Sequence, residues 1–161
     1  MVLAALDIQG SIEPYLNDFR YFLTNELSMI KISKYLDADL VTFLDVDTRD
    51  EALHTLVEMV HNAHLIKDKE AFYNAIIERE KIVSTGIGMG VAIPHAKLVS
   101  YDHFFVAIAI LRRGIDWNAL DHAPVRIIFM IGGPDDKQTE YLQILSSLTL
   151  MLKDEQRRKK C

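Results

Sequence analysis

Residues 78–95 read EREKIVSTGIGMGVAIPH, and the fold and the candidate site are both organised around this stretch. It begins as a helix end and continues into a loop in which glycine alternates with other residues. Glycine accepts positive φ angles and allows a close approach to the backbone, so this loop suits a surface on which another molecule docks. Pro94 has a fixed φ and no N–H group, which predicts that a short apolar strand ends there. His95 is therefore expected at the edge of an element rather than buried within one.

Composition indicates one folded domain that works inside the cell. The chain has 161 residues, of which 50% are hydrophobic, enough for one domain with a substantial core. Its formal net charge of −5 argues against a nucleic-acid-binding surface. The only cysteine is Cys161, so no disulfide can form within the chain and a reducing compartment is expected. The sequence shows neither a membrane-span-length apolar run nor a signal peptide, so we expect a soluble cytoplasmic protein without membrane insertion.

Hydrophobic periodicity predicts alternating helices and strands along the chain. Thr48 and Glu51 form a capping-box pattern at the beginning of one helix. The runs 103–111 and 125–131 are nearly continuous in apolar residues, as strands are when both faces of their sheet are covered. The other expected elements are a strand over 40–46, helices over 11–30 and 68–80, and a last helix over 137–152 with Leu142, Leu145, Leu148 and Leu152 on one stripe. This order favours an α/β fold with helices on both faces of one sheet.

The expected helix at 11–30 precedes the rest of the domain and carries an amphipathic stripe. Such a stripe needs a surface to cover. Either it packs on the domain, or it serves as a dimerisation or partner helix.

Three spaced segments within 78–95 resemble one protein family. They are residues 79–80 (RE), 84–88 (STGIG) and 92–95 (AIPH). Together they are similar to the fructose/mannitol-type (type 2) enzyme IIA domain of the bacterial phosphotransferase system, and most similar to its nitrogen-regulatory branch. The resemblance covers residues 32–152 and implies a single domain with a mixed central sheet of about five strands. Residues 1–31 are then an N-terminal helical extension, and residues 153–161 are a basic, solvated C-terminal tail.

The resemblance implies that His95 is a phosphoacceptor. A neutral imidazole is a competent nucleophile, and the phosphoramidate that it forms stays reactive enough to pass phosphate on. By resemblance, an HPr-type phosphohistidine carrier modifies His95 on Nε2. The protein would then be a stoichiometric phosphoryl carrier rather than an independent catalyst, with no cofactor and no metal.

Arg79 and the loop residues are the expected supports of this histidine. Phosphoryl transfer places negative charge on the equatorial oxygens, and Arg79 offers a permanently charged fork of donors. By resemblance, Thr85 lies beside the histidine, and we assign Ser84, Gly86 and Gly88 to the same support. Backbone N–H groups of this loop are further candidate donors to an anion.

One position departs from the family pattern. Many members carry a second histidine at the beginning of the last helix, where this chain has Tyr141. Tyr141 can donate a hydrogen bond to a phosphoryl oxygen, but it cannot act as an imidazole base. Onward transfer is therefore expected to be slower, altered in direction, or replaced by regulation.

Other histidines offer alternatives to this interpretation. His103 and His122 are candidates for a second active-site histidine. His54, His61 and His64 share one expected helix, but no cysteine or carboxylate pattern completes a zinc site, which favours a solvated helix surface. The glycine loop lacks the spacing of a nucleotide-binding motif and is followed by a strand pattern rather than a helix.

Two functions from different classes fit the sequence. In the favoured hypothesis the protein is a phosphorylation-dependent regulator of nitrogen or carbon metabolism or of transport, and its phosphorylation state changes its affinity for a kinase or transporter. In the alternative it is a soluble IIA component that passes phosphate to a IIB component for fructose- or mannitol-type sugar uptake. The added charge of about −1.5 to −2 on phosphorylation is large enough to make or break a transient interface.

Overall fold

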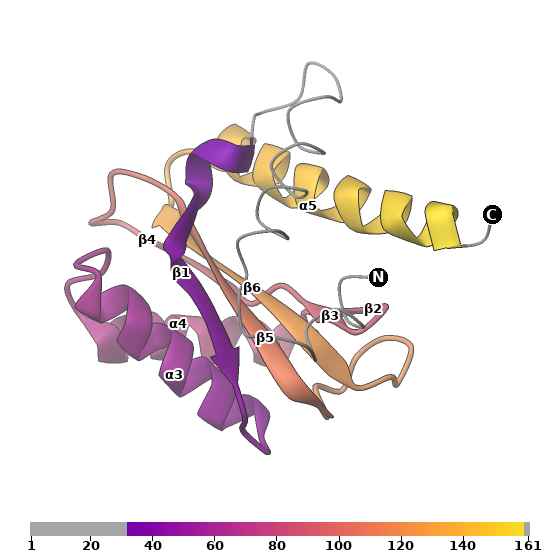
Figure 1. The fold of residues 1–161 in the computed structure, drawn as a ribbon. Helices are drawn as coiled ribbons and strands as arrows, with labels where there is room; N and C mark the ends of the chain where they lie inside the picture. The colour runs from indigo at the N-terminus through magenta and orange to yellow at the C-terminus, as the bar shows by residue number, and fades with distance from the viewer. Residues whose placement is uncertain (1–31, 160–161) are drawn as a thin grey trace. The chain divides into compact units, whose positions relative to one another are not determined.

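The computed structural model describes the backbone of residues 32–159 and the side chains of residues 32–152. The chain divides into two compact units. One unit is Tyr35–Lys137, which contains the sheet and two helices (Figure 1). The other contains the last helix together with Ile32–Lys34. The expected helix at 11–30 lies outside the described residues.

A mixed sheet forms the centre of the first unit. Within the described residues it has six strands, with β1, β5, β6, β3 and β2 as successive neighbours and β4 also paired with β6. The pair β5–β6 is antiparallel, whereas β1–β5, β3–β6 and β4–β6 are parallel, so the predicted mixed sheet is confirmed. The strands are β1 (Leu36–Leu44), β2 (Gly86–Gly88), β3 (Val91–Ala92), β4 (His95–Leu98), β5 (Phe105–Ile115) and β6 (Val125–Pro134).

Two helices, α3 (Arg49–Asn62) and α4 (Lys69–Ile82), pack against each other and against this sheet. The Thr48 side chain accepts the Glu51 N–H, and the Glu51 side chain accepts the Thr48 N–H, so the predicted capping box is present. Asp68 caps α4 in a similar way by accepting the Ala71 N–H. Both caps satisfy donors that a helix leaves unpaired at its beginning.

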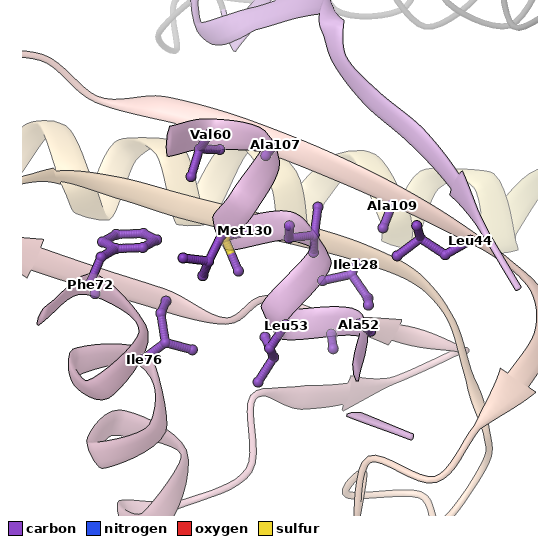
Figure 2. Close-up of a cluster of buried hydrophobic side chains, with 14 of the residues drawn as sticks. Leu44, Ala52, Leu53, Val60, Phe72, Ile76, Ala107, Ala109, Ile128 and Met130 are labelled. Carbon is purple, nitrogen blue, oxygen red and sulfur yellow. The ribbon is translucent and has the colours of Figure 1, made fainter. Parts of the chain in front are cut away.

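The hydrophobic core of this unit lies between the two helices and the sheet. Leu53 and Val60 of α3 and Phe72 and Ile76 of α4 are fully buried there beside Met130 of β6 (Figure 2). Each large apolar side chain buried in this way contributes roughly 1.5–3 kcal/mol. The core therefore fixes the helices on the sheet, and with them the last turn of α4.

The sequence predicted that a strand ends at Pro94, but in the structure the pairing with β6 continues past this residue. The strand β3 ends at Ala92, yet the chain continues along the same neighbour, because the Pro94 carbonyl accepts the Ile131 N–H and β4 begins at His95. Proline lacks a donor but keeps its acceptor, so it interrupts the ladder without ending the pairing. His95 is thus the first residue of a strand that pairs only with β6 among the described strands.

The second unit contains α5 (Gln138–Lys159), which continues beyond the predicted end at Leu152. An ion pair of 3.8 Å joins the Glu140 carboxylate of α5 to the Lys34 ammonium of the same unit. The predicted leucine stripe is buried only in part, because Leu148 is fully buried whereas Leu142 is 50% exposed. Among the α5 side chains that the structure describes, the buried ones are Tyr141, Ile144, Leu148 and Met151.

None of the helices among the described residues combines the length and the apolarity that crossing a membrane requires.

Candidate functional site

The half-buried ring of His95 is held by one hydrogen bond on each nitrogen. The Nε–H of Arg79 lies 3.1 Å from His95 Nε2, and His95 Nδ1 lies 2.9 Å from the Ile93 carbonyl oxygen. A guanidinium group can only donate, so Nε2 must accept and the ring proton must be on Nδ1, which donates to Ile93. The contacts therefore select the neutral tautomer whose lone pair is on Nε2.

Arg79 reaches this ring from the last turn of α4. Its Nη1 donates to the Val83 carbonyl at 2.9 Å, which satisfies one of the carbonyl groups that a helix leaves free at its end. This second bond holds the planar guanidinium while Nε addresses the histidine. The structure thus brings the two predicted site residues into direct contact, although they are far apart in the sequence.

The surroundings of His95 favour its neutral form. Burial lowers the pKa of the ring, and the nearby Arg79 charge lowers it further. The hydrogen bond to the Ile93 carbonyl and the charge of Glu80 act in the opposite direction but do not reverse the shift. A neutral imidazole is the nucleophilic form, so the site keeps His95 ready to react near neutral pH.

Sequence reasoning gave no role to Glu80, which the structure makes a central residue. Its side chain is only 7% exposed. One carboxylate oxygen accepts the Thr85 hydroxyl and, at 3.4 Å, the Trp117 indole N–H, while the other accepts the Thr85 backbone N–H at 3.2 Å. A buried carboxylate requires such partners. The signal in the sequence was a glutamate in the last turn of a helix, close to a loop that it could reach.

The glycine loop is a tight hairpin of β2 and β3. Gly88 and Gly90 have φ angles of 96° and 75°, which most side chains do not tolerate. A Cβ on Gly86 would lie 2.8 Å from the Cβ of Ala119, so this position needs glycine for a different reason, namely close packing.

The segment between β5 and β6 forms hydrogen bonds with residues 84–89, which include the first strand of this hairpin. The Ser84 hydroxyl donates to the Trp117 carbonyl at 3.0 Å, and the Leu120 N–H donates to the Gly86 carbonyl at 3.0 Å. The Asp121 carboxylate accepts the Met89 N–H at 2.9 Å. The segment that links the two long strands therefore fixes the shape of the loop before His95.

These bonds alter the expected use of the loop as an anion-binding nest. The Thr85, Gly86 and Met89 N–H groups donate to the side chains of Glu80, Ser84 and Asp121 respectively. Because these donors already have protein acceptors, the loop supports the site through rigidity more than through free N–H groups. The positive charge near the ring comes mainly from Arg79, with a smaller effect from Lys97.

Tyr141 and the other histidines are the remaining candidate residues. Tyr141 is buried on α5 in the second unit. His103 and His122 are exposed, and His54 stacks on Tyr73 with ring centroids 4.0 Å apart. The residues that the structure describes contain no group of three or more His, Cys, Asp or Glu side chains placed to hold a metal ion.

Comparison with known proteins identifies the family. Residues 34–161 match the family described as "Phosphoenolpyruvate-dependent sugar phosphotransferase system, EIIA 2". The chain belongs to this family. A fructose-specific EIIA component from Haloferax volcanii is 37% identical over 113 residues, which are 70% of this chain and 73% of that protein. A nitrogen regulatory protein from Bradyrhizobium diazoefficiens is 33% identical over 118 residues, covering 73% and 76% of the two chains.

A solved structure agrees with this assignment. The nitrogen regulatory protein IIA-Ntr from Neisseria meningitidis has a TM-score of 0.69 and 25% sequence identity, covering 73% of this chain and 80% of that one. The relatives of this chain thus include a protein named as a fructose-specific EIIA component and proteins named for nitrogen regulation. Membership supports a role in a phosphoryl relay.

The lowered pKa of His95 predicts the pH dependence of this EIIA chain. The ring should titrate below the ordinary histidine value of 6.5, measured by NMR of the ring carbons and nitrogens. The unfolded chain takes up the proton at the ordinary pKa, so stability should fall as the pH drops from that value through the lower folded pKa. A His95→Ala variant should lose this part of the acid sensitivity. A measured pKa at or above 6.5 would show that burial does not control the ring.

Proposed function

We propose that this EIIA chain accepts a phosphoryl group on Nε2 of His95 from an HPr-type phosphohistidine carrier. The observation that supports the proposal is the pair of bonds on the imidazole, with Nδ1–H on the Ile93 carbonyl and Nε2 facing Arg79. This arrangement prepares a lone pair beside a fixed positive charge. A phosphoryl acceptor needs both features.

The transfer follows from this geometry. The Nε2 lone pair attacks the phosphorus of the carrier's phosphohistidine, and a new N–P bond forms while the N–P bond of the carrier breaks. The electron pair of the broken bond returns to the carrier's ring nitrogen. The proton on Nδ1 stays in place and keeps donating to Ile93, so the ring orientation is the same before and after the step.

Arg79 has a different contact before and after transfer. In the unphosphorylated protein its Nε–H donates to the lone pair that must attack, so this bond is released as phosphorus approaches. The Nη1 bond to Val83 holds the guanidinium nearby, where it can donate to the phosphoryl oxygens. A positioned cation stabilises the charge that spreads over these oxygens in the transition state.

We favour a regulatory use of this phosphorylation. The similarity of fold to a nitrogen regulatory protein, and Tyr141 in the place where many EIIA domains have a second histidine, support a cytoplasmic regulator of a kinase or transporter. In that role Tyr141 would support the phosphohistidine without acting as a base. The similarity to a fructose-specific EIIA component favours the alternative, in which a IIB component receives the phosphate.

The first test is phosphorylation itself. Incubation with phosphoenolpyruvate, enzyme I and an HPr-type carrier should add one acid-labile phosphate per chain, measured by intact-mass spectrometry and by radiolabel. A His95→Ala variant should take up none. His103→Ala is the matched control, because it removes an exposed histidine just before β5 and should be labelled like wild type. Equal labelling of the His95→Ala variant would refute the assignment.

The second test concerns the counter-charge. An Arg79→Ala variant should still fold, because the side chain is not part of the hydrophobic core. Its phosphorylation rate should fall by about 10²-fold, as expected when one donor to a developing anion is lost. The measurement is a quenched time course at several carrier concentrations. A rate equal to that of wild type would remove the proposed role of Arg79.

The third test separates regulation from transport. Phosphorylated protein is mixed with a fructose-type IIB component from the same cell, and the label is followed over time. We expect the label to remain on His95 while the affinity for a kinase or transporter target differs between the two phosphorylation states. Rapid movement of the label to the IIB component, with equal target binding in both states, would instead establish the transport alternative.

A further inference from the structure

Glu80 lies at the beginning of a chain of hydrogen bonds that ends on the His95 ring. Its carboxylate accepts both the hydroxyl and the backbone N–H of Thr85. The Thr85 carbonyl accepts the Ile93 N–H at 3.0 Å. The Ile93 carbonyl in turn accepts His95 Nδ1 at 2.9 Å. The buried carboxylate is thus connected to the reactive imidazole through two backbone groups.

We propose that Glu80 is a positioning residue that keeps the His95 proton on Nδ1 by fixing Thr85 and, through it, the Ile93 peptide. The inference rests on the proposed function of His95 as a phosphoacceptor, but the position of the proton can be measured without it. It gives Glu80 a role in the chemistry of the site besides its role in the fold.

The backbone geometry explains how the effect reaches the ring. The N–H and the C=O of Ile93 bond to Thr85 and His95, whereas the next carbonyl, that of Pro94, bonds to β6. The Thr85 carbonyl therefore orients the Ile93 N–H. If Thr85 shifts, the Ile93 carbonyl can turn away from Nδ1. The ring then loses the acceptor that favours its present tautomer.

The consequence for reactivity is direct. With the proton on Nε2 the lone pair lies on Nδ1, and two donors face each other at Arg79. That tautomer cannot accept the Arg79 hydrogen bond and cannot attack phosphorus from Nε2. The rate of phosphorylation should therefore follow the fraction of ring that carries its proton on Nδ1.

A purely structural role for Glu80 is the competing explanation. Its third contact, from the Trp117 indole N–H at 3.4 Å, reaches the segment between β5 and β6 and could serve only to hold that segment. The two bonds from Thr85 instead link Glu80 to the residue whose carbonyl accepts the Ile93 N–H. The two explanations differ in what they predict for the tautomer of a protein that remains folded.

The test uses Glu80→Gln, which keeps the size of the side chain. Its amide places an N–H₂ group at one of the two oxygen positions, so in either orientation Thr85 loses an acceptor for its hydroxyl or for its backbone N–H. The ¹⁵N chemical shifts of the unphosphorylated His95 ring report which nitrogen carries the proton. We expect the Nδ1–H form to dominate in wild type and the Nε2–H fraction to rise in the variant. The phosphorylation rate should fall about tenfold, in keeping with a lost orienting contact.

Two controls separate positioning from stability. Glu58→Gln makes the same chemical change in an exposed carboxylate of α3. This carboxylate pairs with Lys69, which lies at the beginning of α4, at the opposite end of that helix from Arg79 and Glu80. Val60→Ala removes buried core volume and lowers stability without touching the loop. Both should keep the wild-type tautomer and rate at a temperature where they are folded. If Val60→Ala shifts the tautomer as Glu80→Gln does, the effect is general loosening and the proposal is wrong.

The remaining outcomes each decide the question. Should Glu80→Gln not fold, Thr85→Val removes only the hydroxyl donor and must show the same shift in tautomer. A variant with wild-type tautomer and rate overturns the positioning role and leaves the proposed function intact. If wild type accepts no phosphate, the proposed function fails, and the ring shifts alone decide whether Glu80 fixes the proton.

Discussion

The hydrogen bond from the Arg79 Nε–H to His95 Nε2 is the contact on which the candidate site depends. It exists only while Nε2 has a lone pair, which requires the ring proton on Nδ1 and an acceptor for that proton, the Ile93 carbonyl. The rest of the unit meets these two requirements. The core fixes α4 so that its last turn delivers the guanidinium, and the interruption between β3 and β4 turns the Ile93 carbonyl toward the ring.

Much of this arrangement could be predicted because its signals are local. A capping box is read from Thr48 and Glu51 alone, and apolar runs of strand length identify β5 and β6 without knowledge of their neighbours. The glycines before Pro94 indicated a loop that uses positive φ angles, and Gly88 and Gly90 have them. The contact between Arg79 and His95 was expected from the resemblance, since helical periodicity places an arginine at the end of α4 but does not say what it faces.

The parts that could not be predicted depend on which residues meet in the folded chain. A glutamate in a helix is usually exposed, and Glu80 is buried because Thr85 and Trp117 supply donors from a loop and from a segment beyond β5. The last helix shows the same limit. It is apolar at so many positions that more than one stripe fits helical spacing, and tertiary contacts, not periodicity, select Tyr141 over Leu142 for burial.

Arg79 and Glu80 are adjacent in the last turn of α4, and their contacts lead to the two different nitrogens of the His95 ring. Successive residues on a helix point about 100° apart, so one side chain reaches Nε2 while its neighbour reaches the loop that orients Nδ1. The proposed phosphorylation at Nε2 would remove the acceptor of the Arg79 Nε–H, and the guanidinium would have to rearrange beside the Val83 carbonyl. Ile82 and Val83 are 79% and 51% exposed there. The phosphoryl charge of about −1.5 to −2 would thus appear next to an apolar edge, where it can change which partner binds.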